Sequence, residues 1–263
     1  MNILVFIKQV ADTEARILIN GDNRTLEIEN KYAINFFDEF AVEEAIRIKE
    51  QTKESQVTVC TYGPPGAIEA LRTAIAMGAD RAFLIDSTTC ENDDPLIVSD
   101  ILAGFAKKEN FDLILCGRQA IDDENANVGA MVAEFLNIPH VSWITKLEVL
   151  DESKARVENE IEGGRRVLEV TLPALFTTQK GLNEPRVPLI TGVMKAMRAE
   201  IPVIDPATLD IPKEALSKDA SKVTVLSYEY PAQRPPVKII GGATPEEKAR
   251  KLIHVLKEDA KVL

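Results

Sequence analysis

Cysteine and histidine are scarce in this sequence, with three cysteines and two histidines among 263 residues. Cys60, Cys90 and Cys116 are widely spaced and odd in number, which argues against a disulfide framework and indicates a reducing, cytoplasmic compartment. No cysteine pair has the C-x-x-C spacing, and His140 and His254 lie far apart in the sequence. We therefore expect no metal site and no Cys-His nucleophile.

Basic residues are outnumbered by acidic ones: the sequence has 31 lysines and arginines and 42 aspartates and glutamates, which gives a net charge of −11. This balance argues against a nucleic-acid partner, since phosphate backbones demand a basic face. The N-terminal run MNILVFIKQV is apolar for only a few residues before Lys8, so it predicts a first strand that is too short for a signal peptide or a membrane span. The 45% content of hydrophobic residues is ordinary for a soluble globular protein.

Short apolar runs alternate with helical patterns through the first half of the chain. The runs predict strands at residues 3–7, 56–62, 81–85 and 113–115. Helices are predicted to begin at Asn35 as the N-cap, after Pro64-Pro65, at Asp94-Pro95 and near Val128. A turn-rich hairpin excursion occupies residues 12–28. This alternation predicts an α/β fold with a mainly parallel sheet flanked by helices.

After His140 the pattern changes to extended segments. A strand at 141–146 precedes a β-hairpin over 154–172 with a Gly163-Gly164 turn, then an extended stretch to 178 and a weak helix near 190–199. From residue 201 prolines, Pro235 among them, break any long element until Pro245 starts an amphipathic helix. We divide the chain into a domain at 1–200 and an extended C-terminal arm at 201–263. The arm either docks on a partner subunit or closes over its own domain.

The segment 111–136 has the order of a ligand-binding strand, loop and helix. A helix N-terminus at the carboxyl edge of a parallel sheet offers unpaired N–H groups that suit a phosphate. Gly129, which lacks a Cβ, would let a ligand approach the first turn of the helix.

The acidic run Asp122, Asp123 and Glu124 admits two interpretations. The carboxylates either cap the helix and complement its dipole, or they flank a phosphate held by backbone amides and by Asn125 or Asn127. The residues alone leave both open.

Several segments resemble one known family over nearly the whole length: ILVFIKQV, MGADRAFLI, GRQAIDDENANVGAMVAEFL and LNEPR. The most diagnostic is KARVENEIEGGRRVLEVTLPALFT, a hairpin with an acidic-Gly turn followed by a Leu-Pro strand. The chain resembles the β, or small, subunit of electron transfer flavoproteins. The resemblance implies a Rossmann-like fold of the nucleotide-binding alpha hydrolase type.

The resemblance also implies a heterodimer with a homologous α subunit, in which a mobile α-subunit domain holds most of a redox FAD. Electrons would come from dehydrogenases such as the acyl-CoA dehydrogenases of fatty acid β-oxidation and pass to a membrane quinone oxidoreductase, or run the other way. The subunit itself would not be embedded in the membrane. The sequence shows no acid-base or nucleophile constellation, so we expect an electron carrier in which the flavin supplies the chemistry.

In this family the β subunit carries an adenine nucleotide, usually AMP, and the resemblance transfers its site to particular positions. Phe6, Phe37 and Tyr62 could equally be core residues. The implied cofactor-binding residues are Phe6, Asn35, Phe36, Phe37, Asp38, Tyr62, Asp122, Asp123, Glu124, Asn125, Ala126, Asn127, Val128, Gly129, Ala130, Met131, Val132 and Ala133.

Phe36 stands where proline is common in the family. GRQAID and Asp38 are similar to electron-bifurcating relatives, which hold a second FAD in this site, whereas the acidic run DDE and LNEPR are similar to the AMP-binding group. One alternative is therefore an NADH-dependent bifurcating flavoprotein with FAD in place of AMP. Another is a stand-alone nucleotide-binding module, which the long arm disfavours.

Residues 179–197 are similar to the family's partner-recognition loop. The resemblance assigns partner binding to Leu182, Asn183, Glu184, Pro185 and Arg186, with Leu182 as an apolar anchor for a dehydrogenase. The open alternative is that Leu182 packs into its own subunit.

Overall fold

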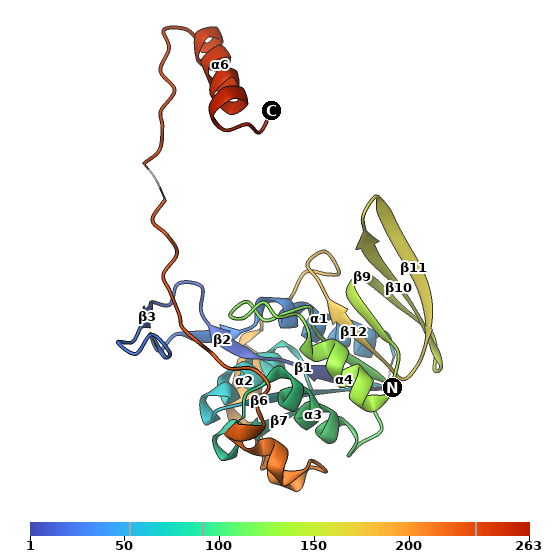
Figure 1. The fold of residues 1–263 in the computed structure, drawn as a ribbon. Coiled ribbons are helices and arrows are strands. Elements are labelled where there is room, and N and C mark those ends of the chain that lie inside the picture. The colour runs from blue at the N-terminus through green and yellow to red at the C-terminus, as the bar shows by residue number, and fades with distance from the viewer. Residues whose placement is uncertain (53, 91, 235) are drawn as a thin grey trace. The chain divides into compact units, whose positions relative to one another are not determined.

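The computed structural model describes residues 1–52, 54–90, 92–234 and 236–263, so that Pro235 lies outside it. The chain separates into two compact units, Met1–Leu226 and Ser227–Leu263 (Figure 1). Within the described segments, every helix is too short or too polar to cross a bilayer.

A mixed sheet forms the centre of the first unit (Figure 1). Across the described residues its strand order is β11-β10-β9-β12-β8-β1-β6-β7-β13. The parallel strands are β1 (Asn2–Phe6), β6 (Gln56–Gly63), β7 (Arg81–Asp86), β8 (Leu113–Gly117), β12 (Ala174–Thr178) and β13 (Val203–Ile204). β9 (His140–Asp151) runs parallel to β12 and starts an antiparallel extension with β10 (Lys154–Ile161) and β11 (Gly164–Thr171).

Helices cover both faces of this sheet. Ile3 and Val5 of β1 face the core shared with α1 (Phe36–Gln51) and α2 (Ile68–Met77). Leu4 and Phe6 face the opposite core, which includes α3 (Pro95–Ala106) and α4 (Val128–Leu136). Successive strand residues thus point to opposite layers, which explains the continuous apolar run. The predicted α/β fold with a mainly parallel sheet is confirmed.

The two predicted hairpins are also present. The excursion contains β2 (Gln9–Ala11) paired with β5 (Tyr32–Ile34) and β3 (Ile17–Ile19) paired with β4 (Leu26–Ile28). The second hairpin pairs β10 with β11, and Ile161 is opposite Gly164 at its turn. Short 3-10 turns, η1 (Pro65–Ala67) and η2 (Ser87–Thr89), follow β6 and β7.

Residues 201–226, which the sequence analysis placed in the arm, belong to the first unit. β13 extends the sheet beside β7, and Leu209 and Ile211 are buried in the α3 and α4 core. α5 (Ile190–Arg198) lies just before this segment, which contains the turns η3 (Pro206–Thr208), η4 (Lys213–Leu216) and η5 (Lys218–Ala220). The prolines predict extended structure but carry no signal that the intervening apolar side chains are buried.

The second unit contains the predicted final helix, α6 (Pro245–His254), which continues into a π-helical turn at Val255–Asp259. Thr244 caps α6, since its hydroxyl oxygen accepts a hydrogen bond from the Glu247 N–H at 3.2 Å.

Candidate functional site

A cavity of about 380 Å³ lies at the carboxyl ends of β1, β6 and β8, the edge where the sequence analysis placed a ligand. Adjacent parallel strands end side by side there, so residues distant in sequence are brought together. The predicted site residues that line the cavity are Phe6, Asn35, Asp38, Tyr62, Asp123, Asn125, Ala126, Asn127, Val128, Gly129 and Val132.

The remaining predicted residues lie outside the lining, and the geometry of α1 and α4 explains this for those that lie on the two helices. A contiguous stretch of helix turns its side chains in all directions, so only one side of α4 faces the cavity. Ala133 is buried in the core instead, and Phe36 is 41% exposed. The residues outside the lining are Phe36, Phe37, Asp122, Glu124, Ala130, Met131 and Ala133.

Several lining residues were not predicted from the sequence. Most of them lie at or just after the carboxyl end of a strand, or at the start of the next helix. The rule that ligands bind at this edge of a parallel sheet could have identified them. They are Ile7, Lys8, Gly63, Ser87, Asp93, Pro95, Val98, Leu102, Cys116, Gly117, Arg118, Gln119 and Ala120.

Lys8 changes the electrostatics of the acidic run. Its Nζ donates to Asp122 Oδ1 at 2.8 Å and to Asp123 Oδ2 at 3.3 Å. Burial alone would lower the Lys8 pKa, but the hydrogen bond and negative charge of Asp122, with those of Asp123, raise it. The two carboxylates are therefore paired with a cation instead of capping α4, whose N-cap is Asn127 and has no side-chain cap. This pairing weakens their repulsion of a phosphate.

Asp38 is a buried carboxyl that joins three elements at the cavity wall. Its oxygens accept hydrogen bonds from the Lys8 N–H at 2.7 Å and the Gly117 N–H at 2.9 Å. The side chain thereby links the start of α1 to the ends of β1 and β8. Burial raises the pKa of Asp38 from 3.8 to about 7, although these N–H groups act in the opposite direction.

The raised pKa predicts how Asp38 contributes to stability as pH changes. The folded chain binds the Asp38 proton more tightly than the unfolded chain, so the stabilisation is complete below pH 3.8 and is lost as pH rises towards about 7. The Asp38→Asn variant has no carboxyl to titrate, so its stability should not fall with pH for this reason. Denaturant unfolding of both proteins at about pH 5 and about pH 8 should show the parent losing stability relative to the variant. Identical pH dependence would show that the Asp38 pKa is not raised.

The loop between β8 and α4 has an unusual backbone. Glu124 and Ala126 adopt left-handed φ values of 52° and 54°, which non-glycine residues rarely do. Asn35, expected to cap α1, holds this loop instead: its Nδ2 donates to the Gln119 carbonyl at 2.9 Å and its Oδ1 accepts from the Ile121 N–H at 3.1 Å. Asn35 is the N-cap residue of α1, as predicted, but its side chain makes no capping hydrogen bond. The N–H groups of Glu124 and Asn125 in this loop already donate within the loop, to the Ala120 carbonyl at 3.0 Å and to Asp123 Oδ1 at 3.1 Å.

Two polar atoms of the lining have no hydrogen-bond partner within the described residues: Asn127 Oδ1 and Arg118 Nε, both buried. A buried unpaired polar group costs about 1–3 kcal/mol, so such atoms are uncommon without a ligand or water. Two residues of the lining, Asn127 and Arg118, thus each carry a buried polar atom that a ligand bound in the cavity could pair after a small side-chain movement.

Gly129 lines the cavity, and packing gives a further reason for the glycine. A Cβ at this position would lie 2.7 Å from Thr177 Cγ2 and 2.9 Å from Cys116 Sγ. Glycine is therefore required for α4 to pack against β8 and β12, and the approach of a ligand stays a prediction. A bulky substitution here would disturb packing first.

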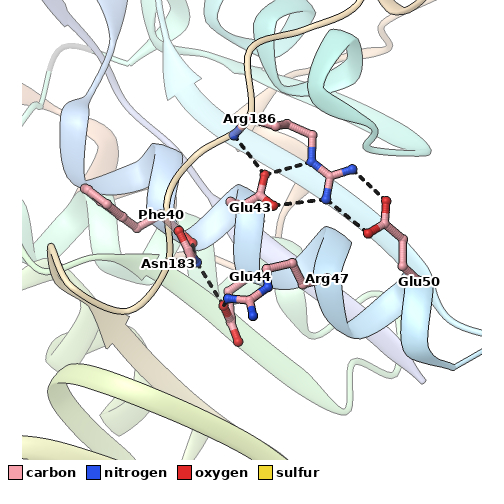
Figure 2. Close-up of polar contacts among 7 residues, drawn as sticks. All are labelled: Phe40, Glu43, Glu44, Arg47, Glu50, Asn183 and Arg186. Atoms are coloured by element: carbon pink, nitrogen blue, oxygen red, sulfur yellow. Dashed lines mark hydrogen bonds and ion pairs between the residues drawn. The ribbon is translucent and has the colours of Figure 1, made fainter.

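The loop at residues 182–186 is fastened to α1, as Figure 2 shows. Arg186 donates to both oxygens of buried Glu43, at 2.8 and 3.0 Å, and its Nη1 donates to Glu50 at 2.6 Å. Asn183 Nδ2 donates to Glu44 at 2.8 Å. Leu182 is half-buried against the α1 and α2 core, so in this chain it packs on its own subunit, and its role towards a partner remains a prediction.

The part of the chain that the structure describes contains no group of three or more His, Cys, Asp or Glu residues arranged to hold a metal ion. Cys60, Cys90 and Cys116 are buried free thiols, and burial raises the pKa of Cys60 and Cys116. A protonated buried thiol behaves as a small apolar side chain.

Comparison with known proteins gives one consistent result. Residues 24–209 match the family model of the electron transfer flavoprotein domain. The chain is 37% identical over 265 residues to electron transfer flavoprotein subunit beta of Bacillus subtilis (strain 168), covering 100% of both chains. It is 36% identical to the subunit beta of Dictyostelium discoideum, covering 99% of this chain and 98% of that one. It is 38% identical to the subunit beta of Homo sapiens, covering 89% and 90% respectively.

Proposed function

The chain belongs to the electron transfer flavoprotein family, among its β subunits, and on this premise we propose that it is the small subunit of a heterodimeric electron carrier. An α subunit would hold most of the redox FAD, and the flavin would accept and release the electrons. Acyl-CoA dehydrogenases or related enzymes would reduce the flavin, and a membrane quinone oxidoreductase would oxidise it. Similarity over the full length supports this proposal. We place the heterodimer in the cytoplasm.

The observation that carries a nucleotide role for this subunit is the cavity with its two unpaired polar atoms. We propose that AMP binds there. The volume of about 380 Å³ is within the usual range for small-molecule sites, and apolar side chains such as Phe6, Val98 and Leu102 line part of the wall. The N–H groups at the start of α4 suit the phosphate. Bound AMP would stabilise the folded chain by mass action. It would contact the ends of β1 and β8 and the following loop, which Asp38 and Asn35 already join.

FAD is the second candidate for this cavity. It contains the AMP moiety and extends it with a flavin, and the lining also includes Arg118, Gln119 and Ala120, which follow β8. With FAD bound, the heterodimer would be an electron-bifurcating enzyme that accepts hydride from NADH.

Flavin reduction by each donor separates these functions. The heterodimer, co-expressed with its α subunit, is mixed with an acyl-CoA dehydrogenase and an acyl-CoA while the flavin absorbance is followed; NADH alone is added to a second sample. An electron carrier is expected to bleach with the dehydrogenase and to remain oxidised with NADH. Rapid bleaching with NADH alone favours the bifurcating function, and no bleaching with either donor contradicts the proposal.

Asn127→Ala tests the placement of the nucleotide. Because Asn127 Oδ1 has no partner in the described chain, its removal should leave the stability of the empty protein nearly unchanged. Loss of one hydrogen bond to the ligand should weaken nucleotide binding by about tenfold, equivalent to about 1.4 kcal/mol. Isothermal titration of nucleotide-stripped parent and variant measures this change. Equal affinities would remove Asn127 from the site.

A further inference from the structure

Part of the cavity wall is formed by a short stretch of the loop between β8 and α4, residues 122–126. Each residue of this stretch is exposed. Asp122 and Glu124 do not line the cavity, so the stretch has one side towards the cavity and one towards solvent. We call it the flap. The flap residues that line the cavity are Asp123, Asn125 and Ala126.

The two ends of the flap are fixed, and its middle is tethered at one place. Before it, the Ile121 N–H donates to Asn35 Oδ1 at 3.1 Å. After it, the Asn127 carbonyl accepts from the Met131 N–H of α4 at 3.0 Å. Among the described residues, the hydrogen bonds that join the flap to another element are those from Lys8. A loop held in this way between a cavity and solvent has the construction of a lid.

Lys8 holds the flap from a backbone that is itself fixed on both sides. Its N–H donates to Asp38 Oδ2 at 2.7 Å, and its carbonyl accepts from the Asn35 N–H at 2.9 Å. Its Nζ donates to Asp122 and Asp123 of the flap, at 2.8 and 3.3 Å. The ammonium group therefore connects the flap to the carboxyl end of β1.

This contact is weak enough to open. The side chain of Lys8 is 42% exposed, and those of Asp122 and Asp123 are 35% and 40% exposed. Ion pairs with such exposure change an equilibrium constant by up to about fivefold, and salt weakens them. The pair can therefore break and form again while the rest of the wall stays folded.

We propose that Lys8, Asp122 and Asp123 form a latch that holds the flap closed over the cavity and sets the rate at which AMP leaves. This inference rests on the proposed function, because it assigns to the flap the release of the nucleotide bound behind it. When the Lys8 contact breaks, the flap moves away from the end of β1 and opens a path to solvent.

The competing role for Lys8 is to bind the phosphate directly, as a cation on a flexible stem. The two roles predict opposite effects of removing the carboxylates. A Lys8 side chain freed from Asp122 and Asp123 would hold a phosphate more tightly, and two fewer negative charges would repel it less. Release would then slow down. An unlatched flap, in contrast, releases AMP faster.

The release rate of AMP from the purified heterodimer distinguishes these roles. The protein is loaded with radiolabelled AMP and mixed with excess unlabelled AMP, and the retained label is followed with time. Lys8→Met and the double variant Asp122→Asn/Asp123→Asn should each release AMP several-fold faster than the parent. Combining the three substitutions should add little, because each variant removes the same contact.

Lys146→Met is the matched control. Lys146 also pairs with an acidic side chain, Glu158 at 3.0 Å, but on the β9 and β10 strands outside the cavity lining. Its release rate should equal that of the parent. Salt gives a second measurement: a change from about 0.05 M to about 0.5 M should accelerate release from the parent more than from the double variant, because screening weakens the latch.

Slower or unchanged release from the double variant overturns the latch, as does an equal salt effect in parent and double variant. Either result leaves the proposed function intact, because AMP is still bound. Absence of AMP from every heterodimer, the parent included, overturns both.

Discussion

Gly117→Ala is expected to destabilise the chain by about 3 kcal/mol and to reduce nucleotide binding strongly. A Cβ at Gly117 would overlap Asp38 Oδ1 and lie 2.8 Å from both the carbonyl carbon and the Cβ of Phe37. These atoms belong to the first turn of α1, and backbone cannot move aside as a flexible side chain can. The helix start must shift, and the Asp38 hydrogen bond to the Gly117 N–H is lost with it.

Gly164→Ala is the control for this change, because a Cβ at Gly164 meets nothing within 4 Å. It should change the free energy of unfolding by less than about 0.5 kcal/mol, as exposed substitutions usually do. Denaturant unfolding and nucleotide titration of the two variants measure both effects. If Gly117→Ala were as stable as Gly164→Ala and bound nucleotide normally, the close approach of α1 to β8 would be wrong.

Arg186→Ala should cost about 3–5 kcal/mol, because it leaves the buried Glu43 carboxylate without its cation. The side chain of Glu43 is 6% exposed, and all the Arg186 bonds to it and to Glu50 disappear together (Figure 2). The loop at 182–186 then loses its attachment to α1 at Arg186 and keeps the one at Asn183. We expect slower electron exchange with the dehydrogenase at unchanged flavin content, which stopped-flow mixing measures.

Arg156→Ala provides the comparison for Arg186. Arg156 also pairs with two glutamates, Glu148 and Glu169, but these side chains are 53% and 55% exposed. Exposed pairs contribute about 0–1 kcal/mol, so the variant should unfold and exchange electrons nearly as the parent does. Equal losses from the two substitutions would mean that burial of Glu43 does not set the strength of the Arg186 pair.

Local patterns predicted most of the fold. The strand at β1 is apolar on consecutive residues because both faces are covered, and Asp94-Pro95 marks the start of α3, where the Asp94 side chain accepts from the Leu96 N–H. β13 was not predicted. Val203 and Ile204 lie between prolines, and they form a strand because they pair with the edge of β7. Their structure depends on a neighbour distant in sequence.

The candidate site shows the same limit. The rule that ligands bind at the carboxyl edge predicted its place, and the resemblance supplied many of its residues. The roles of individual side chains depend on long-range partners that no spacing reveals: Lys8 neutralises Asp122, and Asn35 holds the loop at Gln119. The packing role of Gly129 could not be predicted for the same reason, because its neighbour Thr177 comes from a distant strand.

The central claim is that this β subunit holds an adenine nucleotide in the cavity at the carboxyl edge of its sheet. The most direct test is to denature the purified heterodimer and quantify the released small molecules by chromatography. We predict one FAD and one AMP per heterodimer. Two FAD without AMP would assign the cavity to a second flavin and the protein to electron bifurcation. A single FAD with no second nucleotide would contradict a nucleotide site in this subunit.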